Sequence, residues 1–345
     1  TVDNFIDQSD VESLRAKTIP TGSILFAKIG EAIRQNHRVI AHQNLLIDNN
    51  AMAAIPSEKI DNLYLYYFLK QVDFYRLAPA TTVPALRKSD LQKIKIPLPP
   101  LLEQRRIASI LDKADELRQK RQQAIKKLDQ LLQATFIDMF GDPVSNPKGW
   151  QIGSLNTYGS YKNGLNFGKA ESGFKVRYLG VGNFKNHSKI DDMTNLSFID
   201  LNDLPSKDYF LKNGDLIFVR SNGNRELVGR CIAVYPNEEL VTYSGFCIRY
   251  RIESLELDSS YLVHLFRSKS FKQTILDGGQ GANIQNINQQ LLSRLQIPIP
   301  PKDLQEKWGK FLECLEDQKQ KLYKQLDMQN QLFSSLQNKA FSGNL

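Results

Sequence analysis

One sequence pattern occurs twice in this chain of 345 residues, so any fold for it must accommodate two copies of one unit. Ile96-Pro97-Leu98-Pro99-Pro100 recurs as Ile297-Pro298-Ile299-Pro300-Pro301, an offset of 201 residues (297 − 96). A long uninterrupted helical pattern follows each copy, and a Gly-x-Ile/Leu-x-Phe segment precedes each one, at Gly22 and at Gly214. The sequence therefore predicts a compact domain and a long helix, each present twice.

The two long helical patterns cover about residues 101–140 and 302–341. Each begins after a proline pair and ends at a glycine, as helix boundaries do. Apolar residues recur at steps of three and four in both. In the first helix they are Ile107, Ile110, Ala114, Leu117, Ala124, Leu128 and Leu131, widened by Leu111, Ile125, Leu132 and Phe136. In the second they are Leu312, Leu315, Leu322, Leu326, Phe333, Leu336 and Ala340. Burial of the two stripes against each other predicts an intramolecular antiparallel coiled coil.

The remaining sequence of each copy is typical of an α+β domain. Apolar runs such as 23–27 and 215–219 predict strands, and Tyr64–Leu69 and Tyr261–Phe266 predict one short helix per copy. We expect an α+β fold in which two similar domains are separated by the two packed helices. The expected boundaries are 1–97 for the first domain, 98–149 for the first helical spacer and linker, 150–296 for the second domain and 297–345 for the second spacer.

The two copies differ in length. Phe5-Ile6-Asp7 matches Phe198-Ile199-Asp200, so the segment 150–192 has no counterpart in the first copy. We expect the first domain to lack its opening residues, which indicates a truncated chain or one piece of a split protein.

Composition limits the classes of partner and compartment. The net charge is +8 and the isoelectric point about 9.2, and the excess is spread along the chain. A spread positive bias fits a polyanion such as DNA, and it equally fits an ordinary basic protein. No apolar run approaches the ~18 residues of a membrane span. The three cysteines form no Cys-x-x-Cys pair, which favours free thiols in a reducing cytoplasm.

The motifs of catalysis are absent from the sequence. None of the four histidines has metal-ligand spacing, and no phosphate-binding Gly-x-x-x-x-Gly-Lys-Ser/Thr loop occurs. Gly180-x-Gly182 lacks the third glycine of a dinucleotide fingerprint. The proline pairs follow Leu98 and Ile299, so neither forms the Asn/Asp-Pro-Pro-aromatic loop of amino-methyltransferases. We expect no catalytic residue, no metal site and no cofactor in this chain.

The residue types that read DNA lie in equivalent loops of the two copies. Arginine can bond guanine, and asparagine or glutamine can bond adenine, through paired hydrogen bonds in the major groove. The loop after Phe218 contains Arg220, Ser221, Asn222, Asn224 and Arg225. The loop after Phe26 contains Lys28, Arg34, Gln35, Asn36 and Arg38. Each loop alone could be an ordinary polar hairpin. Different residues at equivalent places predict two readers with different targets.

Further candidates for DNA contact lie in other polar segments. The segment before each proline-rich hinge contributes Thr82 and Arg87 in the first copy and Asn283, Gln285 and Asn286 in the second. A third segment, found only in the second copy, contributes Lys162, Asn163 and Asn166. The first long helix carries a basic run without acids over 117–128, which is either a solvated face or a surface for a partner subunit or the DNA backbone.

Taken together, these segments resemble the specificity (S) subunit of type I restriction–modification enzymes. The residues that carry the resemblance span the whole chain: Leu91–Pro100, Leu292–Pro301, Leu131–Pro143, Asn146–Trp150 and Lys339–Leu345. The resemblance implies two target-recognition domains, each reading half of a split double-stranded DNA site, and helical spacers that set the gap. It implies methyltransferase (M) subunits, which bring S-adenosylmethionine, and restriction/translocase (R) subunits, which bring ATP and Mg²⁺. The S subunit itself performs no chemistry.

Two alternatives remain open on the sequence alone. The chain could be the recognition portion of a fused restriction–modification enzyme. It could also be a partial, non-functional or regulatory specificity subunit left by gene rearrangement.

Overall fold

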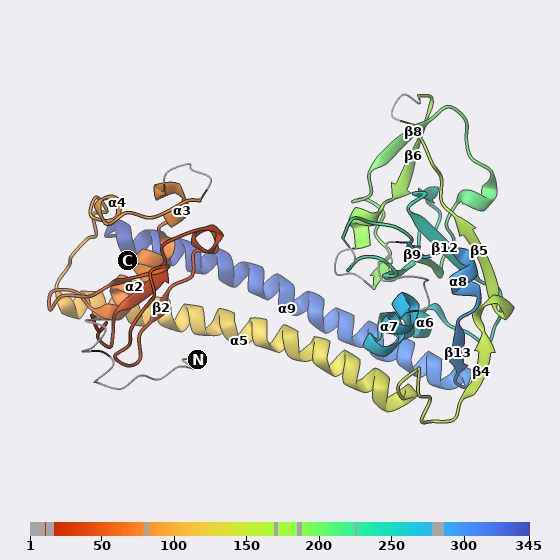
Figure 1. Ribbon diagram of the computed structural model, residues 1–345, viewed down its shortest axis with the longest axis horizontal. Helices are drawn as coiled ribbons and strands as arrows, with labels where there is room; N and C mark the ends of the chain where they lie inside the picture. Colours follow the sequence, from red (N-terminus) through yellow and green to blue (C-terminus); the bar gives the residue numbers. More distant parts are fainter. Residues whose placement is uncertain are drawn as a thin grey trace. The chain divides into compact units, whose positions relative to one another are not determined.

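The computed structural model describes residues 11, 17–78, 83–168, 172–184, 188–224, 226–277 and 286–345. The chain forms two compact units (Figure 1). Unit 1 comprises Thr1–Ile125 and Lys321–Leu345, and unit 2 comprises Lys126–Gln320. The two long helices, α5 (Leu101–Phe140) and α9 (Lys302–Ser342), each contribute one part to unit 1 and the other part to unit 2.

Unit 1 contains a small antiparallel sheet with strand order β2-β1-β3. The strands are β1 (Ile24–Ala27), β2 (Val39–Ile40) and β3 (Ala51–Ala54), followed by α2 (Asn62–Gln71), α3 (Phe74–Leu77) and α4 (Lys88–Leu91). The central strand buries Ile24 and Phe26 on one face, because side chains alternate along a strand. These two residues join Phe68 and Phe74 in the core of the unit.

Helix α2 connects this sheet to the long helices. Asp61 caps its first turn by accepting hydrogen bonds from the backbone N–H groups of Leu63 and Tyr64. Tyr64 and Tyr67 then pack in one cluster with α5 and α9 side chains, namely Ile107, Ala108, Leu111, Phe333 and Ala340.

Unit 2 contains a five-stranded sheet of order β5-β12-β9-β10-β7, a three-stranded sheet of order β11-β6-β8 and the pair β13-β4. The strands are β4 (Gln151–Ser154), β5 (Gly159–Asn163), β6 (Phe174–Leu179), β7 (Lys189–Ile190), β8 (Phe198–Leu201), β9 (Asp215–Val219), β10 (Cys231–Val234), β11 (Val241–Tyr243), β12 (Cys247–Ile252) and β13 (Gln296–Ile299). The helices are α6 (Ser259–Arg267), α7 (Lys269–Asp277) and α8 (Gln289–Ser293), with four 3₁₀ turns elsewhere in the described chain, Glu31–Ile33, Leu155–Thr157, Val181–Phe184 and Lys207–Tyr209.

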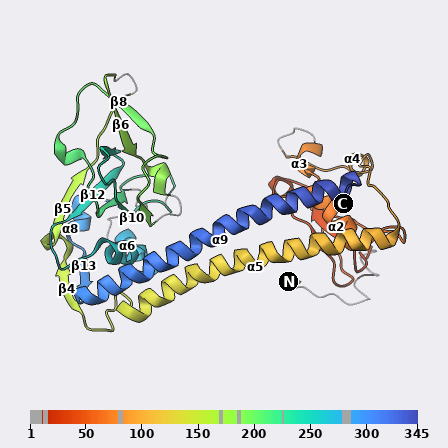
Figure 2. The same ribbon diagram turned by 180° about the vertical axis from the view of Figure 1, so that it is seen from behind.

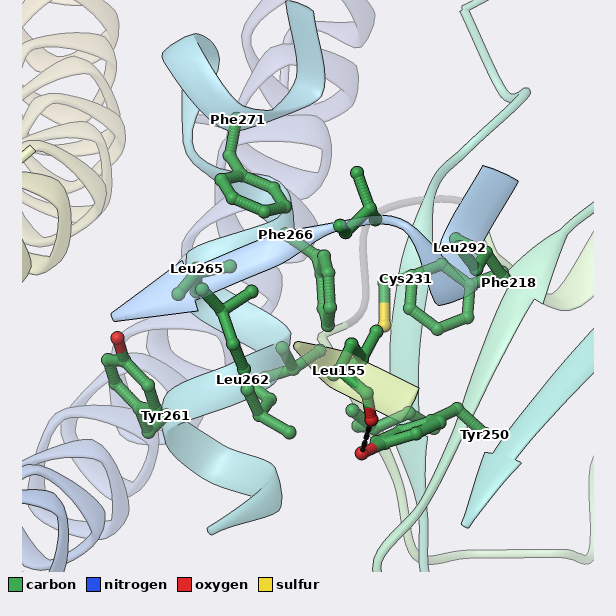
Figure 3. Close-up of a cluster of buried hydrophobic side chains, with 14 of the residues drawn as sticks. Leu155, Phe218, Cys231, Tyr250, Tyr261, Leu262, Leu265, Phe266, Phe271 and Leu292 are labelled. Atoms are coloured by element: carbon green, nitrogen blue, oxygen red, sulfur yellow. Dashed lines mark hydrogen bonds between the residues drawn. The ribbon is translucent and has the colours of Figure 1, made fainter. Parts of the chain in front are cut away.

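The largest buried cluster of unit 2 lies between the five-stranded sheet and α6 (Figure 3), and a second cluster covers the other face of this sheet. Every residue of β9 is buried, so this strand is covered on both faces. Phe218 of β9 meets Phe266 of α6 with ring centroids 4.8 Å apart. The buried Tyr250 hydroxyl donates to the backbone oxygen of Leu155 at 2.9 Å, which satisfies the polar atom of this large side chain (Figure 3).

The predicted duplication is confirmed at the level of topology. In unit 1, β1 pairs antiparallel with β2 and β3. In unit 2, β9 pairs antiparallel with β10 and β12, and α6 follows as α2 does. Strands β4 and β5 lie in the segment that the sequence predicts only in the second copy. The α+β fold with two similar domains and two long helices is therefore confirmed.

The two long helices pack antiparallel within each unit (Figure 2). In unit 1, Arg118 Nε donates to Asn330 Oδ1 at 2.8 Å. In unit 2, Lys319 Nζ lies 2.9 Å from Asp129 Oδ1. The antiparallel pairing is as predicted. No helix in the described part of the chain is long and apolar enough to cross a membrane.

The predicted apolar stripe of α5 needs a correction. Leu117 and Leu131 are 47% and 48% exposed, whereas the widening residues Leu111, Ile125 and Phe136 are buried. The packed face includes the polar Asp115, which is buried beside Lys70 of α2 at 2.8 Å. Apolar periodicity treats a buried charged residue such as Asp115 as exposed. Most of the predicted stripe therefore lies one residue away from the face that is packed in the structure.

Candidate nucleic-acid interface

The loop Arg220–Asn224 of unit 2 leaves the buried strand β9 and is held from both sides. The backbone N–H of Arg220 donates to Phe246 O at 2.8 Å, and its carbonyl accepts from the Ile287 N–H at 2.9 Å. Ser221 and Asn286 form an antiparallel β-bridge. Two segments that the sequence analysis selected separately are thus brought together.

The same arrangement occurs in unit 1. Ile29, which follows β1, forms an antiparallel β-bridge with Ala85. The Gly30 N–H donates to Pro84 O at 2.8 Å, and the Leu86 N–H donates to Lys28 O at 2.9 Å. Lys28 and the exposed Arg87 therefore belong to two adjoining segments, as Arg220 and Asn286 do in unit 2.

A pocket opens beside the unit 2 loop, with a cavity volume of about 600 Å³. Its lining comes from five separate segments of the sequence: Phe167, Tyr178, Gly180, Val181, Gly182, Asn183, Ser197, Ser221, Asn222, Gly223, Ser244 and Phe246. The sequence analysis missed 180–183 and 244–246 as site residues. Their glycines predict loops, but glycine occurs in loops of every kind and does not indicate a binding site. Only the fold places these loops beside Asn222.

The loops around the pocket approach each other closely because of two glycines. A Cβ at Gly164 would lie 2.1 Å from Ser244 O, and one at Gly245 would lie 1.9 Å from Asn166 Oδ1. The absence of side chains allows Leu165 to form a β-bridge with Ser244. Asn166 consequently lies against the loop that carries Phe246.

Two asparagines of the pocket use their side-chain oxygens within the protein. Asn222 Oδ1 accepts from the Asn224 N–H at 2.8 Å, and Asn183 Oδ1 accepts from the Gly180 N–H at 2.9 Å. Their amide NH₂ groups donate to no other described residue. Asn224 Oδ1 accepts from the Glu226 N–H at 3.0 Å, so it stabilises the same turn.

Two further candidates of unit 2 lie at the end of β5. The Lys162 ammonium lies 3.6 Å from Asp208 Oδ2 and 4.2 Å from the centroid of the Tyr209 ring. Asn163 is exposed and pairs with Ile248 of β12. Lys162 is therefore anchored within the domain, while Asn163 is free to contact a ligand.

In unit 1 the structure separates scaffold residues from exposed ones. Arg38 is buried, and its guanidinium lies 3.7 Å from the centroid of the Phe74 ring. Burial lowers the pKa of Arg38 to about 10, an effect that Asp73 partly opposes. Asn36 adopts a left-handed φ of 52° and accepts a hydrogen bond from Arg38 Nη2 at 2.7 Å. Both residues therefore stabilise the conformation of the loop itself.

The remaining unit 1 candidates reach solvent. Arg34 is paired with Glu31 at 2.7 Å and its guanidinium lies 4.3 Å from the centroid of the Tyr75 ring, but more than half of its side chain is exposed. Gln35 and Arg87 are exposed and Lys28 is half-buried. The candidates Arg225, Thr82, Asn283 and Gln285 lie outside the described residues. Within the described chain, no group of three or more His, Cys, Asp and Glu side chains could hold a metal ion.

Comparison with known proteins identifies relatives over most of the chain. The family model described as "Type I restriction modification DNA specificity domain" matches residues 2–127 and 147–329, one segment for each copy of the repeat. The chain is 26% identical over 314 residues to the Type I restriction enzyme StySPI specificity subunit of Salmonella potsdam, with 84% of this chain and 67% of that protein covered. It is 26% identical over 285 residues to the MjaVIII specificity subunit of Methanocaldococcus jannaschii, with 75% and 64% covered. The chain thus spans about two thirds of the length of these relatives.

Solved structures share the fold at low sequence identity. The crystal structure of the S subunit of a Type I restriction-modification system from M. genitalium matches with a TM-score of 0.54 and 18% identity, covering 94% of this chain and 84% of that one. A structure from work on complex assembly and conformational transition of the type I R-M system matches with a TM-score of 0.59 and 18% identity, covering 95% and 84%. At this identity the likeness concerns the fold alone.

Proposed function

The chain belongs to the type I restriction–modification DNA specificity family, and from this premise we propose that it is the DNA sequence-recognition subunit of a type I complex. It reads a bipartite site in double-stranded DNA with one surface on each unit, and it performs no chemistry itself. The relatives that it matches over most of its length are named specificity subunits of type I restriction enzymes.

The observation that carries this proposal is the repeated reading scaffold. In each unit the loop after the central strand is bridged to the segment before the proline-rich hinge, by Ile29–Ala85 in unit 1 and by Ser221–Asn286 in unit 2. The scaffold is the same, but the exposed polar residues differ. Two scaffolds with different side chains can recognise two different short sequences.

The residues we assign to DNA contact are those that the fold leaves accessible. In unit 2 they are Arg220, Ser221, Asn222, Asn163, Asn166 and Asn286. In unit 1 they are Lys28, Arg34, Gln35 and Arg87. The Arg220 side chain forms no ion pair with the described residues, so its guanidinium is available to guanine or to phosphate.

The proposed partners supply the chemistry. Methyltransferase subunits would bring S-adenosylmethionine, and restriction/translocase subunits would bring ATP and Mg²⁺. The exposed basic residues Lys126 and Lys127 of α5, both in unit 2, offer one surface for these subunits.

The test uses the full chain co-purified with methyltransferase subunits. The complex is incubated with S-adenosylmethionine and a randomised DNA library, and methylated molecules are sequenced. We expect two short specified sequences separated by a fixed unspecified gap. A single continuous motif, or methylation without sequence preference, would refute the proposal.

A further inference from the structure

The pocket beside the unit 2 loop has an unusual lining for a surface that meets DNA. None of its lining residues is charged. It combines three aromatic rings, those of Phe167, Tyr178 and Phe246, with two carboxamides and three serine hydroxyls. Its volume of about 600 Å³ falls within the ~300–1,000 Å³ typical of small-molecule sites.

The polar groups of the pocket are arranged as fixed donors. The oxygens of Asn222 and Asn183 are occupied by backbone N–H groups of their own loops, at 2.8 Å and 2.9 Å. Each carboxamide is therefore held in place and offers its NH₂ group to a ligand. A neutral ligand with hydrogen-bond acceptors on a flat edge suits this arrangement.

The apolar groups of the pocket suit a planar ring. Phe246 is 62% exposed although it is a large apolar side chain, and its loop is fixed by the hydrogen bond from Arg220 N to Phe246 O. Phe167 and Tyr178 pack edge to face with centroids 5.3 Å apart, so their positions are also set. Aromatic side chains of this kind provide stacking platforms for single bases.

We propose that this pocket binds one nucleobase that has left the stack of the DNA duplex. The inference rests on the proposed function and extends it, because it assigns a class of ligand to a specific site. A phosphate is a poorer occupant, since no lysine or arginine lines the pocket. The edge of a paired base is also a poorer occupant, because it lies on the floor of a groove and cannot enter a concave site. An extruded base protrudes from the duplex and presents both its ring faces and its acceptors.

Glycine positions allow the pocket to be filled without disturbing the fold. A Cβ at Gly182 meets no atom within 4 Å, and its φ is not left-handed. Gly182→Trp should therefore occupy the pocket, and Ser206→Trp adds the same side chain at an exposed position of unit 2 as a control. Asn222→Asp is a second probe, because the carboxylate keeps the oxygen that accepts from Asn224 N–H and loses the NH₂ donor.

The measurement uses the full chain with methyltransferase subunits and target DNA carrying 2-aminopurine, whose fluorescence rises when it leaves the stack. The label is placed in turn at each position of the unit 2 half-site. The methylated adenine is omitted, because methyltransferases extrude their own target base. Anisotropy of labelled DNA measures DNA binding in the same samples. A separate titration with free nucleosides tests whether the pocket binds a base that is not part of DNA.

We expect a several-fold rise in fluorescence at one position, retained in Ser206→Trp and lost in Gly182→Trp. Asn222→Asp should weaken the fluorescence rise and lower DNA affinity by about tenfold or more, because it removes one good hydrogen-bond donor and adds a negative charge that the DNA phosphates repel. Normal DNA binding with no responding position, or an equal response in Gly182→Trp, would overturn the inference and leave the proposed function standing. Binding of free nucleosides without a response from DNA would assign the pocket to a small molecule and overturn it as well. Absence of sequence-specific DNA binding would defeat the proposed function itself.

Discussion

Gln104 and Gln305 make the same three hydrogen bonds in the two units. Gln104 Oε1 accepts from the Asp61 N–H at 2.9 Å, and its Nε2 donates to the carbonyls of Lys59 and Pro99 at 3.0 and 2.8 Å. Gln305 repeats this with Asp258, Glu256 and Pro300, each at 2.8 Å. Both side chains are buried. One residue in each unit thus joins the start of a long helix, the proline-rich hinge and the turn before α2 or α6.

Replacement of this glutamine should be costly. Gln305→Leu preserves approximate size and removes the partner of the Asp258 N–H and of the Glu256 and Pro300 carbonyls, of which the Pro300 carbonyl is buried. Because each unsatisfied buried group costs ~1–3 kcal/mol, we expect the free energy of unfolding of unit 2 to fall by about 3 kcal/mol. Urea unfolding followed by tryptophan fluorescence measures it, since Trp308 lies in this core. Gln318→Leu, at an exposed position of α9, is the matched control and should change little.

Arg38 and Arg220, both candidates for DNA contact from their residue type, should respond differently to truncation. Arg38→Ala removes a guanidinium that packs on Phe74 and bonds the Val72 carbonyl at 3.2 Å, so it should lower stability by about 1–3 kcal/mol. Arg220→Ala should leave stability within ~0.5 kcal/mol and alter the methylated sequence in one half of the site only. Thermal unfolding and sequencing of methylated DNA distinguish the two. A change of specificity in both halves after Arg220→Ala would contradict the assignment.

The packed face of α5 can be tested with a pair of leucines. Leu111 is fully buried and Leu117 is 47% exposed; about 1.7 helical turns separate them, which places them on different faces of α5. Leu111→Ala should cost ~2–5 kcal/mol through lost contacts and a cavity. Leu117→Ala should cost less than ~1 kcal/mol. Equal losses in urea unfolding would mean that the corrected stripe is wrong.

His264 should make unit 2 less stable in acid. Its ring packs on Trp308 with centroids 5.2 Å apart, and loss of hydration lowers its pKa from 6.5 to about 4. The unfolded state therefore binds the proton more readily, and stability present above pH 6.5 declines as the pH falls toward 4. The free energy of unfolding should fall by on the order of 3 kcal/mol over this pH range. His264→Phe should flatten the pH dependence of the unfolding free energy over this window, and an unchanged slope would count against the buried neutral ring.

The architecture was predictable because its signals are repeated and long. The proline-rich hinge and the long helix each occur twice in the sequence. An apolar periodicity that continues for about 40 residues leaves few alternatives to a long helix packed against a partner. The face of that helix was less accessible to prediction, because Asp115 and Arg118 occupy packed positions through ion pairing. A periodicity argument counts such residues as solvent-exposed.

The candidate site was only partly predictable for a related reason. The loops after β1 and β9 were identified from their residue types, but residue type does not separate Arg38, stacked on Phe74, from Arg220, which forms no ion pair within the described chain. The segment carrying Phe246 meets Asn222 through the pairing of β12 with β9, and the segment carrying Asn183 joins them through the pairing of β6 with β11. Contacts of this range depend on sheet order, which a single sequence does not reveal.

The discontinuous make-up of unit 1 bears on how the polypeptide acquires its shape during synthesis. Residues 321–345 emerge from the ribosome after all of unit 2, yet Phe333 belongs to the cluster of Tyr67 and Leu111. Unit 1 therefore cannot complete its core until the ribosome has synthesised unit 2 and the last part of α9, and part of its apolar interior stays exposed until then. A nonsense mutation in the part of α9 beyond residue 320 would consequently damage unit 1 more than unit 2.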